Sequence, residues 1–108
     1  MERLTFESKP VVMPFGNKVI VPIGTTENIT LNEEGVEVKT YVADVVYLVD
    51  KPVTRQNIIQ TAIDAEFTAE KQKYVMVNMA KKSDALVKRY NEFIEKVTDE
   101  VEQEGYTD

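Results

Sequence analysis

The chain has 108 residues, of which 43% are hydrophobic and 30% charged, and it contains no histidine and no cysteine. This length and apolar content predict one domain over residues 1–108, with a β-rich half (1–51) and a helical half (52–108). The two missing residue types exclude histidine-based catalysis, imidazole or thiolate metal ligation, disulfides and cysteine nucleophiles.

The net charge of −6 is shared equally by the two halves. Residues 1–51 carry five basic and eight acidic side chains, and residues 52–108 carry eight and eleven. Each half is acidic overall, so neither is a basic module, and because sequence-independent binding needs clustered lysine and arginine to neutralise phosphates, no nucleic-acid partner is expected. No apolar run approaches the length of a membrane span, so no membrane partner is expected. The predicted location is the cytoplasm, or a particle assembled there.

Short strands separated by turns are predicted for the first part of the chain. Leu4 and Phe6 alternate with polar residues, which is typical of a half-buried strand. Gly16-Asn17 lies between two apolar runs, and glycine at the first loop position suits a type II′ hairpin. The predicted strands lie near residues 3–7, 11–15, 18–23 and 28–32, with a loop over 24–27.

The longest predicted strand follows the turn Asn32-Glu33-Glu34-Gly35, which fits a type I turn with a G1 bulge. It spans 36–49, and its apolar parity changes along its length. Either a bulge lies near Thr40, or both faces become buried in the second half. We favour a central strand covered by helices there. Asp44, the single charge in that second half, is interpreted as solvated or edge-facing rather than as a buried catalytic carboxylate.

Helices are predicted from Thr54 onward, because Thr54 is a good N-cap and an apolar stripe of period 3.6 follows it. Thr68 and Ser83 are predicted to cap two further helices. Whether 69–103 forms one helix or two is left open. The fold class is therefore α+β: an antiparallel sheet of about four to five strands (residues 1–50) covered by two or three helices (residues 54–104).

The block Pro52-Val53-Thr54-Arg55-Gln56-Asn57-Ile58-Ile59-Gln60-Thr61-Ala62-Ile63-Asp64-Ala65-Glu66-Phe67 follows the β-rich half directly. In this combination the chain resembles small uncharacterised proteins of gut bacteria and their prophages. The resemblance implies an accessory or structural role, for example in a phage-derived particle, and it transfers no catalytic residue.

The last predicted helix carries the strongest amphipathic pattern, with apolar residues at Leu86, Tyr90, Phe93, Val97 and Val101. A helix over 84–103 is about 30 Å long and would extend past strands of about 20 Å. Tyr90, Phe93, Val97 and Val101 are therefore predicted as an interaction surface for self-association or for a protein partner. The alternative is that helix 69–81 folds back over Val97 and Val101 within the monomer.

These observations predict a non-enzymatic structural or protein-interaction protein. No catalytic residue, cofactor-binding residue or metal ligand is assigned. Glu92, Glu95 and Asp99 share one side of the last helix and could hold a hard cation, but a solvated acidic face is the preferred interpretation. The alternative function is a small-ligand-binding domain or a weak carboxylate-dependent enzyme.

Overall fold

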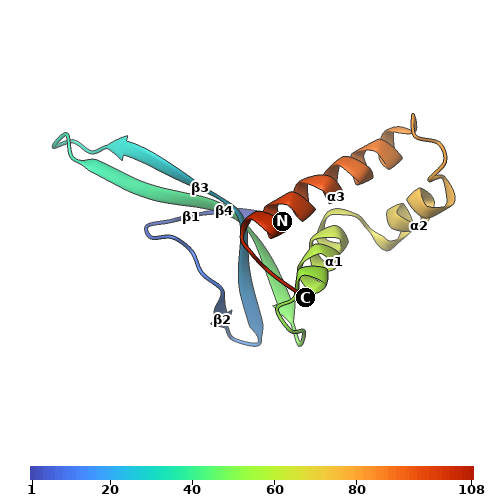
Figure 1. The fold of residues 1–108 in the computed structure, drawn as a ribbon, viewed down its shortest axis with the longest axis horizontal. Coiled ribbons are helices and arrows are strands. Elements are labelled where there is room, and N and C mark those ends of the chain that lie inside the picture. Colours follow the sequence, from blue (N-terminus) through green and yellow to red (C-terminus); the bar gives the residue numbers. More distant parts are fainter.

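A four-stranded antiparallel sheet carries helices on one face in the computed structural model, which describes all residues 1–108 (Figure 1). The elements are β1 (Glu2–Phe6), β2 (Met13–Phe15), β3 (Lys18–Leu31), β4 (Glu37–Val49), α1 (Arg55–Glu66), α2 (Ala69–Val77) and α3 (Ala85–Gln103). The strand order is β1-β4-β3-β2. The predicted α+β fold, with strands before residue 50 and helices after residue 54, is confirmed.

The long β3–β4 hairpin is the axis of the sheet, and its turn is the one that the sequence predicts. Asn32 Oδ1 accepts the backbone N–H groups of Glu34 and Val36, each at 2.9 Å. Gly35 has φ +76°, the left-handed conformation that the G1 bulge requires. The β2–β3 hairpin turns at Gly16-Asn17, where only the glycine has positive φ, as a type II′ turn needs.

A β-bulge interrupts β3 where the sequence predicts a loop. Ile23 pairs with Asp44 and Thr26 pairs with Val42, so two residues, Gly24 and Thr25, lie opposite Ala43 alone. The prediction of a loop over 24–27 is therefore wrong, because the strand absorbs its extra residue and continues. No shift in pairing lies near Thr40.

Both faces of β4 are buried in its second half, as expected for a central strand. Four successive residues, from Ala43 to Val46, are buried. Side chains alternate between the two faces of a strand, so Val46 points toward the helices, and Ala43 and Val45 point away from them. Because β1 and β2 lie at opposite edges, their connection crosses β4 and β3, and its Pro10 is buried.

The main core lies between the sheet and the paired helices α1 and α3. It consists of buried apolar residues from four elements: Val21, Ile23, Val46, Leu48, Ile58, Ala62, Val97 and Val101. Full burial of one such side chain contributes about 1.5–3 kcal/mol of hydrophobic free energy. This core therefore holds α1 and α3 against one end of the hairpin.

The helix boundaries follow from capping side chains. Thr54 Oγ1 accepts the N–H of Asn57, and Thr68 Oγ1 accepts the N–H of Lys71, each at 3.2 Å. Both caps are as predicted. The cap of α3 is Asp84 instead of Ser83, because its carboxylate accepts the N–H groups of the next turn. The segment 78–84 separates α2 from α3, so residues 69–103 form two helices.

The molecule is elongated, with extents of 56 × 33 × 21 Å. Its Cα radius of gyration is 16.6 Å, against about 13 Å for a compact domain of this length. The excess comes from two projections at opposite ends, the far half of the β3–β4 hairpin and the α2–α3 end of the helical layer (Figure 1). No helix has both the length and the apolar character needed to cross a membrane.

Candidate functional site

Two residues of the predicted interaction surface lie inside the monomer. Val97 and Val101 are fully buried against β3, β4 and α1. The prediction that they project beyond the core is wrong. The helix does extend past the sheet, but with its N-terminal half, because its C-terminal half is the part that packs over β3. Nor does α2 cover the two valines, since the sheet and α1 do so.

The other two residues of that surface, Tyr90 and Phe93, are half-buried and serve the packing of α3 on the end of α1. Both rings contact Phe67 edge-on, with centroids 5.2 and 5.5 Å away. The guanidinium of Arg89 lies 5.1 Å from the centre of the Phe67 ring. This cluster supports the overhanging half of α3 and leaves no continuous apolar stripe free on that helix.

The exposed apolar side chains are found elsewhere, and four of them lie on the far half of the β3–β4 hairpin. We call residues 26–40 the arm. Every residue from Thr26 to Lys39 is exposed, and no helix or other strand covers either face (Figure 1). The exposed apolar residues of the arm are Ile29, Leu31, Val36 and Val38.

The strand register divides these four side chains between the two faces of the arm. Ile29 pairs with Lys39 and Leu31 pairs with Glu37, so these side chains share the face that points away from the helical layer. Val38 pairs with Thr30 on the opposite face, and Val36 has the same parity as Val38. Both faces of the arm therefore combine apolar and polar groups, as protein-binding surfaces do.

The arm also has two open edges. β2 pairs with β3 only up to Ile20, and β1 pairs with β4 only from Tyr41 to Val45. A two-stranded ribbon is marginally stable in water, and an open edge presents unpaired N–H and C=O groups to another chain. The arm thus offers both side-chain and backbone contacts.

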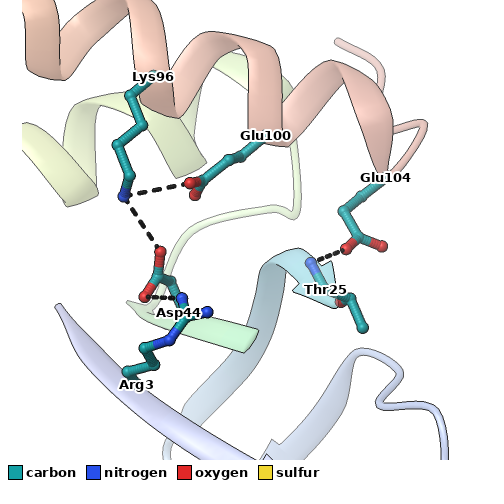
Figure 2. Close-up of polar contacts among 6 residues, drawn as sticks. All are labelled: Arg3, Thr25, Asp44, Lys96, Glu100 and Glu104. Atoms are coloured by element: carbon teal, nitrogen blue, oxygen red, sulfur yellow. Dashed lines mark hydrogen bonds and ion pairs between the residues drawn. The ribbon is translucent and has the colours of Figure 1, made fainter. Parts of the chain in front are cut away.

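A polar network fixes the root of the arm (Figure 2). Asp44, only 6% exposed, accepts Arg3 Nη1 at 3.4 Å and Lys96 Nζ at 3.3 Å. Lys96 also reaches Glu100 Oε1 at 3.1 Å. The network joins β1, β4 and α3 beside the bulge. Asp44 is buried and ion-paired, so the prediction of a solvated or edge-facing residue is wrong.

The ionisation of this network follows its burial. Burial raises the pKa of the Glu100 carboxyl, and the nearby Asp44 adds to the rise while Lys96 opposes it. For Lys96, burial lowers the pKa, but Glu100 and Asp44 outweigh that effect and the pKa is raised. Glu100 Oε2 is buried without a hydrogen-bond partner. Glu100 thus has one carboxylate oxygen paired with Lys96 and one that is buried without a partner.

The end of α3 holds the bulge itself. The backbone N–H of Thr25 donates to Glu104 Oε1 at 2.9 Å, and the Tyr106 hydroxyl donates to the carbonyl of Pro22 at 2.9 Å. Burial, with a smaller effect of Glu104, raises the pKa of Tyr106 to about 12. Gly24 has φ +61°, and a Cβ placed there would lie 2.7 Å from Glu100 Cδ. Only glycine fits this position without displacing Glu100.

The buried carboxylates lie outside the three surface hollows, since Asp44, Lys96 and Glu100 line none of them. No group of three or more acidic side chains is arranged to hold a metal ion. The ion pairs of Asp44 tie the root of the arm to β1 and α3.

The largest hollow, of about 400 Å³, lies between α1 and the edge of β4 beyond the start of β1. Six of its eight lining residues are hydrophobic; the eight are Met1, Glu2, Val45, Val46, Tyr47, Thr61, Ala62 and Ala65. The hydroxyl of Thr61 is buried without a hydrogen-bond partner. This volume and this lining are within the range of small-molecule sites.

The arm was detectable in the sequence only in part. The alternation of Asn28-Ile29-Thr30-Leu31 and the Asn32–Gly35 turn predict a hairpin there. They do not indicate that both faces of this hairpin stay uncovered. Comparisons with protein-family models, with curated protein sequences and with solved structures find no match to this chain. The arm is therefore assigned on geometry alone.

Proposed function

We propose that this chain is a non-enzymatic structural or protein-interaction protein whose contact element is the arm. The observation that carries the proposal is the state of β3 and β4 beyond the bulge. They remain paired to Leu31 and Glu37, yet every side chain from Thr26 to Lys39 is exposed. A ribbon with four exposed large apolar groups and two open edges gains stability when a protein partner covers it.

The root supports the same role. A contact element has to keep a fixed direction, and the ion pairs of the buried Asp44, together with the bond from Thr25 N–H to Glu104, supply that direction. The likeness of the Pro52–Phe67 block to small proteins of gut bacteria and their prophages agrees with an accessory component of a larger assembly, such as a phage-derived particle.

Shortening the arm tests this function. Replacement of residues 29–39 by Asn-Gly joins Asn28 to Thr40, which face each other in the register, through a two-residue type I′ turn. The expected result is an intact, cooperatively unfolding body that no longer captures the protein partners retained by the full chain. Val11→Ala/Val12→Ala, which trims two exposed side chains outside the arm, is the matched control and should capture them all. Capture that survives shortening would refute the proposal.

A second function, binding of a small apolar ligand, is favoured by the hollow between α1 and β4. A thermal-shift screen of metabolites tests it, because a ligand that binds only the folded state raises Tm. Ala65→Leu, an exposed position in the lining, should abolish the shift produced by any true ligand. If no compound raises Tm, or if the shift persists in this variant, the hollow is not a binding site.

A further inference from the structure

We infer that the partner of the arm is a second copy of this chain, which receives it at the α2–α3 end. This inference rests on the proposed function of the arm. It assigns the docking surface to residues 69–89, which we call the basic end. These residues comprise α2, the connection to α3 and the first turns of α3.

The charges of the two surfaces are opposite. The arm has four glutamates and one lysine, a net charge of −3, whereas the basic end has six basic and two acidic residues, a net charge of +4. Within one copy, the arm contains a single ion pair, Glu27 with Lys39. Its remaining glutamates are unpaired, as are five cations of the basic end: Lys71, Lys73, Lys81, Lys82 and Lys88.

The apolar groups match as well. Four large side chains of the basic end are exposed, namely Tyr74, Met76, Val77 and Met79. Methionine side chains adapt to the shape of a partner. Lys73, Tyr74 and Val77 also line a shallow hollow of about 320 Å³ on α2. This hollow offers a place for an exposed side chain of the arm such as Leu31.

The competing acidic surface is the outer side of α3, which carries Glu92, Glu95 and Asp99. It has negative charge but no exposed large apolar side chain, because none of those in the protein falls between residues 80 and 108. Of these two acidic surfaces, only the arm also carries exposed large apolar groups. The complementarity therefore selects the arm over α3 as the occupant of the basic end.

The geometry makes the contact intermolecular. The arm and the basic end lie at opposite ends of the 56 Å axis, so one copy cannot fold its own arm onto its own basic end (Figure 1). The contact joins two different surfaces and is heterologous, so a pair of copies keeps one arm and one basic end free. Such contacts build rings or open chains instead of closed dimers.

Sedimentation velocity over a range of protein concentrations tests the inference. At low salt the wild type should form species larger than dimers. These should dissociate in 1 M salt, where the Debye length is only about 3 Å and the attraction between the two surfaces is screened. Glu33→Lys/Glu34→Lys in the arm and Lys71→Glu/Lys73→Glu in the basic end should each give monomers. All four side chains are exposed and form no ion pair, so the circular dichroism spectra should not change.

The decisive sample is an equimolar mixture of these two variants. Each retains one wild-type surface, and the two changed surfaces carry reversed charges that again attract each other, so the mixture should form species larger than either variant forms alone. Glu92→Lys/Glu95→Lys makes the same charge change on α3 and should assemble like the wild type. A wild type that stays monomeric at low salt, a mixture that stays monomeric, or a control that is equally disrupted would overturn the inference.

The two proposals can fail separately. If the wild type is monomeric but partner capture still depends on the arm, the arm binds a different protein, and only the self-contact is refuted. If neither assembly nor capture depends on the arm, both proposals fail. Retardation of duplex DNA that Lys71→Glu/Lys73→Glu abolishes, without any assembly, would assign the basic end to nucleic acid and also refute the self-contact.

Discussion

The two halves of the β3–β4 hairpin are built from the same two strands and have opposite surroundings. Near the helices, Val21, Ile23, Val46 and Leu48 are buried under α1 and α3. Beyond the bulge, every residue from Thr26 to Lys39 is exposed, on both faces of the hairpin. The ladder of backbone hydrogen bonds continues through both halves, so strand pairing alone does not create a core. The difference shows that the helical layer decides which part of the hairpin is body and which part is contact element.

Truncating one leucine in each half is the strongest test of that division. Leu48 is 1% exposed and Leu31 is 68% exposed. Leu48→Ala leaves a cavity in the core and should lower the free energy of unfolding by about 2–5 kcal/mol. Leu31→Ala should change it by no more than about 0.5 kcal/mol. Urea unfolding followed by circular dichroism measures both, and equal losses would mean that the arm is part of the cooperative core.

Substitutions at two glycines compare the root of the arm with its tip. Gly24 and Gly35 both have positive φ, but only at Gly24 would a Cβ meet another group, the carboxylate of Glu100. Gly35→Ala should cost about 1–2 kcal/mol from its backbone conformation. Gly24→Ala should cost about 2–4 kcal/mol, because displacement of Glu100 adds to the same strain.

The additional cost at Gly24 can be assigned by a double-mutant cycle. In the Glu100→Ala background the carboxylate is gone, so Gly24→Ala should cost only as much as Gly35→Ala does in the wild type. Denaturant unfolding of the four chains gives the coupling. A coupling of zero would show that the close approach carries no energy.

The smallest predicted effect concerns pH. Burial raises the pKa of Glu100 above its usual value of 4.5, so the folded state binds this proton more tightly than the unfolded state does. The contribution of Glu100 is therefore fully present below about pH 4.5 and is lost as pH rises through the folded-state pKa. Glu100→Gln lacks this titration, so its stability relative to wild type should increase with pH over that window. Glu92→Gln, at an exposed glutamate of the same helix, is the matched control, and parallel wild-type and Glu100→Gln profiles would contradict the prediction.

Local signals in the sequence predict the elements, whereas tertiary contacts decide the site. Thr54 and Thr68 cap helices through bonds to residues three positions later, and the Asn32–Gly35 turn closes on itself, so these features follow from neighbouring residues. The stripe on α3 shows that Val97 faces something apolar. It does not show which half of the helix lies on the sheet, because that depends on the path through α2. The burial of Asp44 likewise depends on Arg3 and Lys96, which are distant in sequence.

Because of the bulge at Gly24-Thr25, the direction of the arm can change while the pairing of β3 with β4 stays the same. Because two residues face Ala43 alone, deletion of Thr25 would leave Ile23 opposite Asp44 and Thr26 opposite Val42, with every later pair unchanged. The bend that a bulge introduces would disappear, together with the bond from Thr25 N–H to Glu104. A change of one residue in length can thus re-aim the arm without exchanging its faces. In descent or in engineering, this gives the chain a way to alter the geometry of an assembly while its contact surface stays the same.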